Sequence, residues 1–165
     1  MSVIRVPKAL VQELRTKLRD YPEINYLYED EESIDSQLAR LLYEGVEDFN
    51  NIPPILGTEY TFENIPKRWV RIVIDLAVIR TLMEVSIWMA RNEFEYQTGN
   101  TSVRLYNQWR SYQTLMPMLK QQAEQTAQAV KYKANVDQAW GANLTELYES
   151  WRDLDPNSQW IVVSS

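Results

Sequence analysis

The spacing of apolar residues predicts a chain built mainly from α-helices. Near the N-terminus apolar residues recur every four positions, beside a proline suited to a first helical turn. They are Val6, Leu10, Leu14 and Leu18, with Pro7 as the proline. A second apolar stripe follows Ser33 or Asp35, either of which can cap a helix. Its members are Ile34, Leu38, Leu41, Leu42, Gly45, Val46 and Phe49.

The longest apolar segment begins after Pro66, and we expect one helix from there to about Gln97. Between Trp69 and Ala90 the segment is apolar on nearly every side, so burial is expected. Four charges disfavour a membrane span, because each charge at a bilayer centre costs at least ~2.5 kcal/mol. Before this helix, residues 55–65 predict either a short strand or a loop laid over the core.

The four charges of the long helix form two pairs of opposite sign, each four residues apart. This spacing brings Arg71 to Asp75, and Arg80 to Glu84, on a helix but not on a strand. Two intrahelical ion pairs at the surface are therefore expected. The alternative is that some of these groups bond a neighbouring subunit, because few positions of this helix carry polar residues suited to solvent exposure. The four residues are thus a candidate subunit interface.

A second long helix is expected after the stop signal at Gly99. Thr101 or Ser102 can cap it, Pro117 should kink it, and it should reach about Trp140. Its second half is rich in glutamine and alanine and offers little apolar area for a core of its own. We expect this half to lie at a surface or against another chain.

The last 25 residues, 141–165, are predicted to follow a helical core of residues 1–140 as a short helix and an extended apolar tail. Two alternatives are open for this strand-like tail. It adds to a sheet edge or groove of another subunit, or it folds back on the core of its own chain. The candidate docking residues are Trp151, Leu154, Trp160, Ile161, Val162 and Val163. The predicted fold is therefore all-α, an elongated helical bundle around one long apolar helix with an extended C-terminal tail.

Composition argues against most enzyme chemistry. The 165 residues include no histidine and no cysteine, which removes Ser-His-Asp triads, thiol nucleophiles and the usual zinc ligands. No phosphate-binding glycine loop or EF-hand sequence occurs either. We expect no enzyme, no catalytic residues, no cofactor and no metal. The formal net charge of −6 also disfavours general nucleic-acid binding.

The segments on either side of the long apolar helix resemble those of virion neck proteins of tailed bacteriophages. Ahead of the helix stand FNNIPP at 49–54 and YTFENIP at 60–66. After it stand ARNEFEYQTG at 90–99 and NTSV at 100–103. The similarity covers roughly residues 35–135 and is one of pattern.

This resemblance implies a head–tail adaptor, a structural virion protein assembled in the host cytoplasm. Such adaptors form a closed ring, commonly of about twelve copies, between the portal and the next connector or tail protein. The implied partners are the portal, neighbouring copies, the downstream component and genomic DNA that passes without specific binding, with no membrane. The C-terminal segment, residues 151–163, is the implied portal anchor. The alternatives are a tail-completion or baseplate protein and a helical regulatory module that binds one partner.

Overall fold

The computed structural model describes residues 3–20, 34–91, 95–98, 101–104, 108–140 and 160–164. Within these residues the fold is mostly helical, which agrees with the predicted all-α class. The helices are α1 (Lys8–Leu18), α2 (Asp35–Asn51), α3 (Lys67–Arg91) and α4 (Gln108–Ala139). Two short antiparallel strand pairs accompany them. They are β1 (Val3–Pro7) with β4 (Trp160–Ser164), and β2 (Glu95–Thr98) with β3 (Thr101–Arg104).

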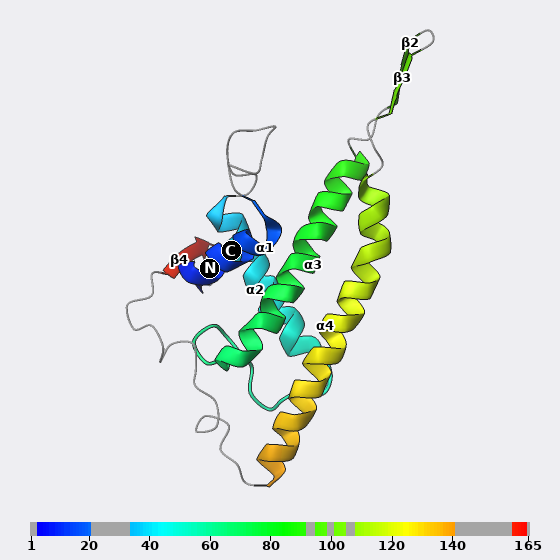
Figure 1. The fold of residues 1–165 in the computed structure, drawn as a ribbon. Helices are drawn as coiled ribbons and strands as arrows, with labels where there is room; N and C mark the ends of the chain where they lie inside the picture. The colour runs from blue at the N-terminus through cyan, green and yellow to red at the C-terminus, as the bar shows by residue number, and fades with distance from the viewer. Residues whose placement is uncertain are drawn as a thin grey trace.

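Helices α3 and α4 form a long antiparallel pair that sets the length of the molecule (Figure 1). Helices α1 and α2 pack against one side of α3, and the β1–β4 pair packs on α1 and α2. The β2–β3 hairpin projects from the far end of the helix pair. The first and last strands lie together, so the chain returns to its beginning. No helix in the described part of the chain is long and apolar enough to cross a membrane.

A buried arginine joins the end of α1 to the start of α2. Arg15 is fully buried and donates to the carboxylates of Asp20, at 2.9 Å, and Asp35, at 2.8 Å. Two carboxylates compensate the buried guanidinium, which would otherwise be costly to desolvate. The predicted capping role of Asp35 is wrong by one position, because Ile34 is the N-cap and the Asp35 side chain is engaged by Arg15.

The first part of α3 is buried on nearly every side. Its apolar residues from Trp69 to Ile79 expose at most 6% of their surface, except the partly buried Val78. The preceding segment is a loop rather than a strand, and it lays Leu56, Tyr60, Phe62 and Ile65 on this core. The side chain of Asn50 holds the loop in place, accepting from the Tyr60 N–H at 3.0 Å and donating to the Tyr60 carbonyl at 2.8 Å.

The predicted boundaries of the two long helices are wrong between residues 92 and 107. Helix α3 ends at Arg91 rather than Gln97, and α4 begins at Gln108 rather than at Thr101 or Ser102. Strands β2 and β3 occupy the interval, with Thr98 opposite Thr101. The physical reason is that the sequence Gly-Asn at 99–100 is typical of a two-residue hairpin connection as well as of a helix stop. Threonine in both strands, tyrosine in β2 and valine in β3 favour strand structure.

The predicted extended C-terminal tail is corrected at residues 160–164. Strand β4 pairs with β1 in the same chain, with Val6 opposite Ile161, and half-buried Ile161 packs on the core. The segment before the first helix is thus the strand partner that the sequence analysis did not find. Residues 160–164 therefore belong with the core rather than with a separate tail. The predicted short helix of residues 141–159 lies outside the described residues.

Gly45 sets how closely α2 approaches α3. A Cβ atom at this position would lie 2.8 Å from the carbonyl oxygen of Val73 and 3.2 Å from the backbone nitrogen of Ala77. Backbone atoms in a packed helix cannot move aside as a flexible side-chain end can. The absence of a side chain at Gly45 therefore permits the crossing of the two helices.

We predict that Gly45→Ala destabilises the fold by about 1–3 kcal/mol through this overpacking, although alanine is the better helix former by ~1 kcal/mol. Gly57→Ala is the matched control, because a Cβ at Gly57 meets nothing within 4 Å. Urea unfolding followed by circular dichroism measures both. Equal midpoints for the two variants would contradict the close approach.

Candidate functional site

The far end of the α3–α4 pair extends beyond the core as an arm (Figure 1). We define the arm as residues 82–91 of α3, residues 108–118 of α4 and the β2–β3 hairpin. The buried core cluster reaches Ile79 on α3 and begins at Ala123 on α4. None of the described residues of the arm belongs to this cluster. Pro117 also withholds one backbone N–H from the arm's part of α4.

Large apolar side chains are exposed on this arm. On α3 they are Met83, Ile87 and Trp88, which expose 42%, 57% and 61% of their surface. On α4, Leu115 and Met118 expose 46% and 67%. Single exposed apolar residues are ordinary, but a group gathered on one short projection is typical of an interaction site.

The exposed residues of α3 continue a stripe that is buried nearer the core. Ile72, Leu76, Met83 and Ile87 are separated by four, seven and four residues, so they share one face of the helix. Ile72 and Leu76 are 5% exposed, whereas Met83 and Ile87 are 42% and 57% exposed. The same face is therefore patterned for burial along its length but is covered only in its first part.

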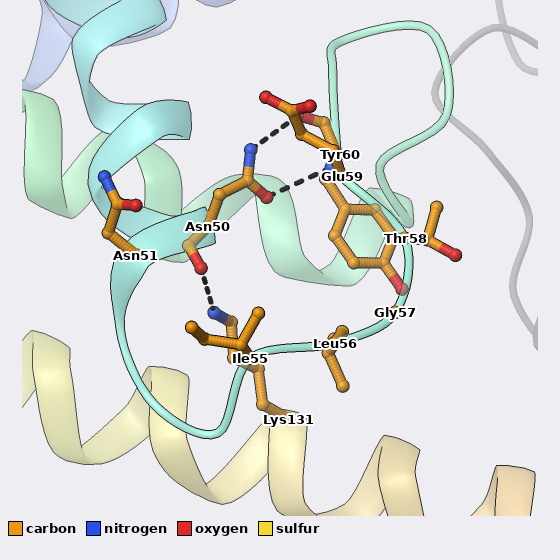
Figure 2. Close-up of a pocket in the computed structure, with 9 residues that line it drawn as sticks. All are labelled: Asn50, Asn51, Ile55, Leu56, Gly57, Thr58, Glu59, Tyr60 and Lys131. Atoms are coloured by element: carbon orange, nitrogen blue, oxygen red, sulfur yellow. Dashed lines mark hydrogen bonds between the residues drawn. The ribbon is translucent and has the colours of Figure 1, made fainter.

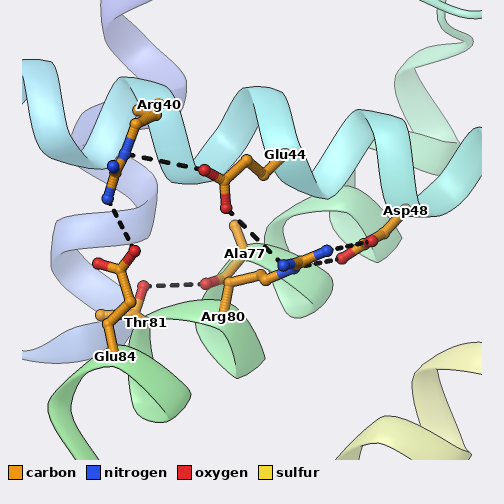
Figure 3. A network of polar contacts seen from close by, with 7 residues as sticks. All are labelled: Arg40, Glu44, Asp48, Ala77, Arg80, Thr81 and Glu84. Atoms are coloured by element: carbon orange, nitrogen blue, oxygen red, sulfur yellow. Dashed lines mark hydrogen bonds and ion pairs between the residues drawn. The ribbon is translucent and has the colours of Figure 1, made fainter. Parts of the chain in front are cut away.

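The candidate interface charges bond other helices of the same chain (Figure 3). Arg80 donates to both carboxylate oxygens of Asp48, at 2.7 and 2.6 Å, and Glu84 accepts from Arg40 at 2.7 Å. Asp75 accepts from Lys17 of α1, and Arg71 is exposed. The pairs that the structure shows run between helices, so the expectation of two intrahelical pairs is wrong for Asp75, Arg80 and Glu84.

The physical reason is a matching row of charges on α2. Arg40, Glu44 and Asp48 stand four residues apart and face Arg80 and Glu84, which also stand four apart. The Asp48 carboxylate raises the pKa of Arg80, because it accepts hydrogen bonds from the charged guanidinium. Each such part-exposed pair contributes ~1 kcal/mol or less to stability, so the row serves register more than strength.

A pocket of about 320 Å³ lies where the end of α2, the following loop and α4 meet (Figure 2). Its lining is Asn50, Asn51, Ile55, Leu56, Gly57, Thr58, Glu59, Tyr60 and Lys131. The single carboxylate in this lining, that of Glu59, is on an exposed residue. Asn50 is occupied in holding the loop. The pocket therefore offers no pair of groups suited to acid–base or nucleophilic catalysis.

Lys131 is the one buried cation of this pocket lining, and it closes the C-terminal end of α2. Its 1% exposed side chain donates from Nζ to the carbonyl oxygens of Asn50, at 3.1 Å, and Ile52, at 2.6 Å. Nζ also lies 4.7 Å from the centre of the Phe49 ring. A cation satisfies the last carbonyls of a helix and interacts favourably with its dipole. Burial nevertheless lowers the pKa of Lys131 to about 8.

Neither Lys131 nor the exposed end of the α3 stripe is among the site residues predicted from the sequence. Lys131 stands among Ala127 and Ala134 on the inward face of α4, a position where a lysine signals a buried acceptor. Of the candidate docking residues, Trp151 and Leu154 lie outside the described residues, and Trp160 to Val163 form part of β4. No cluster of residues able to hold a metal ion occurs in the described ranges.

Comparisons of the chain with models of protein families, with characterised proteins and with solved structures give no match.

We predict that stability rises with pH above 8 because of Lys131. Its pKa is about 8 when folded and about 10.5 when unfolded, so between these values the unfolded state binds the proton that the native state has released. The free energy of unfolding should increase by about 2 kcal/mol between pH 7 and pH 9.5. This range lies below the ionisation of unfolded tyrosine near ~10.

Lys131→Met should abolish this rise, since it keeps the aliphatic stem and removes the titrating group. Lys133→Met is the control, because Lys133 is an exposed lysine two positions along the same helix. Urea titrations at several pH values measure the effect. An unchanged pH dependence in Lys131→Met would show that another group is responsible.

Proposed function

We propose that this chain is a non-catalytic assembly protein whose arm is covered by neighbouring copies of itself. The observation that carries the proposal is the α3 stripe, which is buried at Ile72 and Leu76 and exposed at Met83 and Ile87. An apolar face that continues past its own core is typical of an oligomer interface. The arm projects beyond the core (Figure 1), and such a projection is suited to contact with a next subunit.

The proposed setting is the neck of a tailed bacteriophage, where the chain would act as a head–tail adaptor ring. The sequence resemblance supports this setting, and the arm supports the ring. A ring requires a head-to-tail contact, in which one surface of a subunit meets a different surface of the next. The arm is suited to such a contact, because the arm and the core are different surfaces of one subunit. The arm of one copy would meet the core of the next.

The portal, the downstream connector or tail protein and passing DNA complete the proposed set of partners. A net charge of −6 suits DNA passage, since like charge disfavours binding to phosphate. Portal docking is proposed for Trp151 and Leu154. In the described part of the chain β4 has one strand partner, β1, so residues 160–163 would dock as part of a two-stranded sheet rather than as a free tail.

We predict that Ile87→Asp prevents ring assembly while leaving the subunit folded. Ile87 is 57% exposed, so a charge there is solvated in the free subunit but buried without a partner in the proposed contact. Ile55→Asp is the matched control, because Ile55 is 77% exposed and lies away from the arm. Mass photometry of the chain with portal protein counts the subunits, and circular dichroism checks folding.

The expected result is a closed ring for the wild type and for Ile55→Asp, and loss of the ring for Ile87→Asp with unchanged helicity. Rings formed by Ile87→Asp would overturn the role of the arm. A wild-type chain that stays monomeric at high concentration and does not bind portal would instead favour the helical partner-binding module. Cryo-electron microscopy of the particle then locates the ring in the neck, the tail-completion region or the baseplate.

A further inference from the structure

The outward face of α4 carries an uncharged stripe with the spacing of a coiled coil. Its eight positions advance in alternating steps of three and four residues, and all eight are exposed. We call them the α4 stripe. They are Leu115, Met118, Gln122, Gln125, Ala129, Tyr132, Val136 and Ala139.

The α4 stripe is distinct from the face by which α4 packs on its own chain. That inward face carries the buried residues Ala123, Ala127, Lys131 and Ala134. The charges of this part of α4 lie beside the stripe and not within it, at Lys120, Glu124, Lys133 and Asp137. A helix face meant only for water usually carries charges, so the uncharged stripe indicates a second packing face.

We infer that the α4 stripe binds the α4 stripe of a second copy of this chain, with the two helices antiparallel around a two-fold axis. In one register every stripe position of one copy meets a stripe position of the other, and each layer joins a larger side chain to a smaller or complementary one. The layers are Leu115 with Ala139, Met118 with Val136, Gln122 with Tyr132, and Gln125 with Ala129.

The absence of facing like charges favours a second copy as the occupant. In this register Thr126 faces Thr126 of the other copy, and Gln128 faces Gln128 of the other copy. Gln121 faces Asn135. Lys133 faces Leu119, so no two like charges meet along the contact. This matters for a chain with a net charge of −6, whose charged surfaces repel a second copy.

The exposed area is of the size that a dimer needs. Tyr132 is 69% exposed and Trp140, next to the end of the stripe, is 86% exposed. These two side chains alone expose on the order of 300 Å². Leu115, Met118 and Val136 and the glutamine stems bring the total toward the ~800 Å² per partner of a standard interface.

This inference does not depend on the proposed function. A two-fold contact closes on itself and yields a dimer, whereas a ring needs a head-to-tail contact. The proposed ring contact uses Met83 and Ile87 of α3, and the proposed dimer contact uses the α4 stripe. Loss of one association can therefore be measured while the other persists.

The absence of cysteine from the chain makes cross-linking a clean test. Met118→Cys and Val136→Cys are made separately on the full chain, each with a tag of different size, and treated with a short bis-maleimide. In the antiparallel register Met118 of one copy meets Val136 of the other, whereas two copies of either position lie roughly 27 Å apart along the helix axis. The antiparallel register predicts a covalent dimer when the two variants are mixed and little when each is alone. Lys120→Cys is the control, because its 62% exposed side chain lies off the stripe.

Cross-linking of each variant alone at the level of the mixture would indicate a parallel pair and overturn the proposed register. A mixture that yields no more dimer than Lys120→Cys would overturn the contact itself. As a second measurement, Tyr132→Glu should weaken dimerisation at least tenfold in sedimentation equilibrium. Ile87→Asp should leave the dimer intact, and an unchanged dimer in Tyr132→Glu would also refute the α4 contact.

Discussion

The close crossing of α2 and α3 at Gly45 is the contact on which the rest of the structure depends. Because the Val73 carbonyl lies where a side chain would begin, the two helices meet at backbone distance. This approach aligns the charge row of α2 with Arg80 and Glu84. It also places the end of α2 where the buried Lys131 of α4 can satisfy its last carbonyls. One missing side chain thus governs how three helices meet.

The same arrangement explains why the far end of the molecule is exposed. Helices α1 and α2 and the loop that follows α2 cover only the first part of α3, so the apolar face beyond Ile79 extends without cover from its own core. The polar groups near the core, in contrast, are occupied within the chain, as Arg15, Asn50 and Lys131 show. The two surfaces proposed for recognition, the exposed α3 stripe and the α4 stripe, are apolar or uncharged, which supports the proposed assembly role.

The two proposed association surfaces rest on two different helix patterns. The arm of α3 continues a core stripe and suits a head-to-tail contact, whereas the outward face of α4 has coiled-coil spacing and suits a two-fold contact. Leu115 and Met118 belong to both regions, since the α4 stripe begins on the arm. A protein that uses both surfaces has a route from dimer to larger assembly, and the charge distribution disfavours other self-contacts.

The sequence by itself determined the features that depend on neighbouring residues. The spacing of apolar positions predicted α1 and α2, and Pro66 predicted the start of α3. The expectation that the second half of α4 lies at a surface is right only for its outward face, because Ala123, Ala127 and Ala134 belong to the buried core. Only the tertiary structure decided that β4 returns to β1, that Asp75, Arg80 and Glu84 bond other helices, and that Met83 and Ile87 stay exposed. Periodicity is a local property of the chain, whereas strand pairing, ion pairing and cover depend on which distant segments meet.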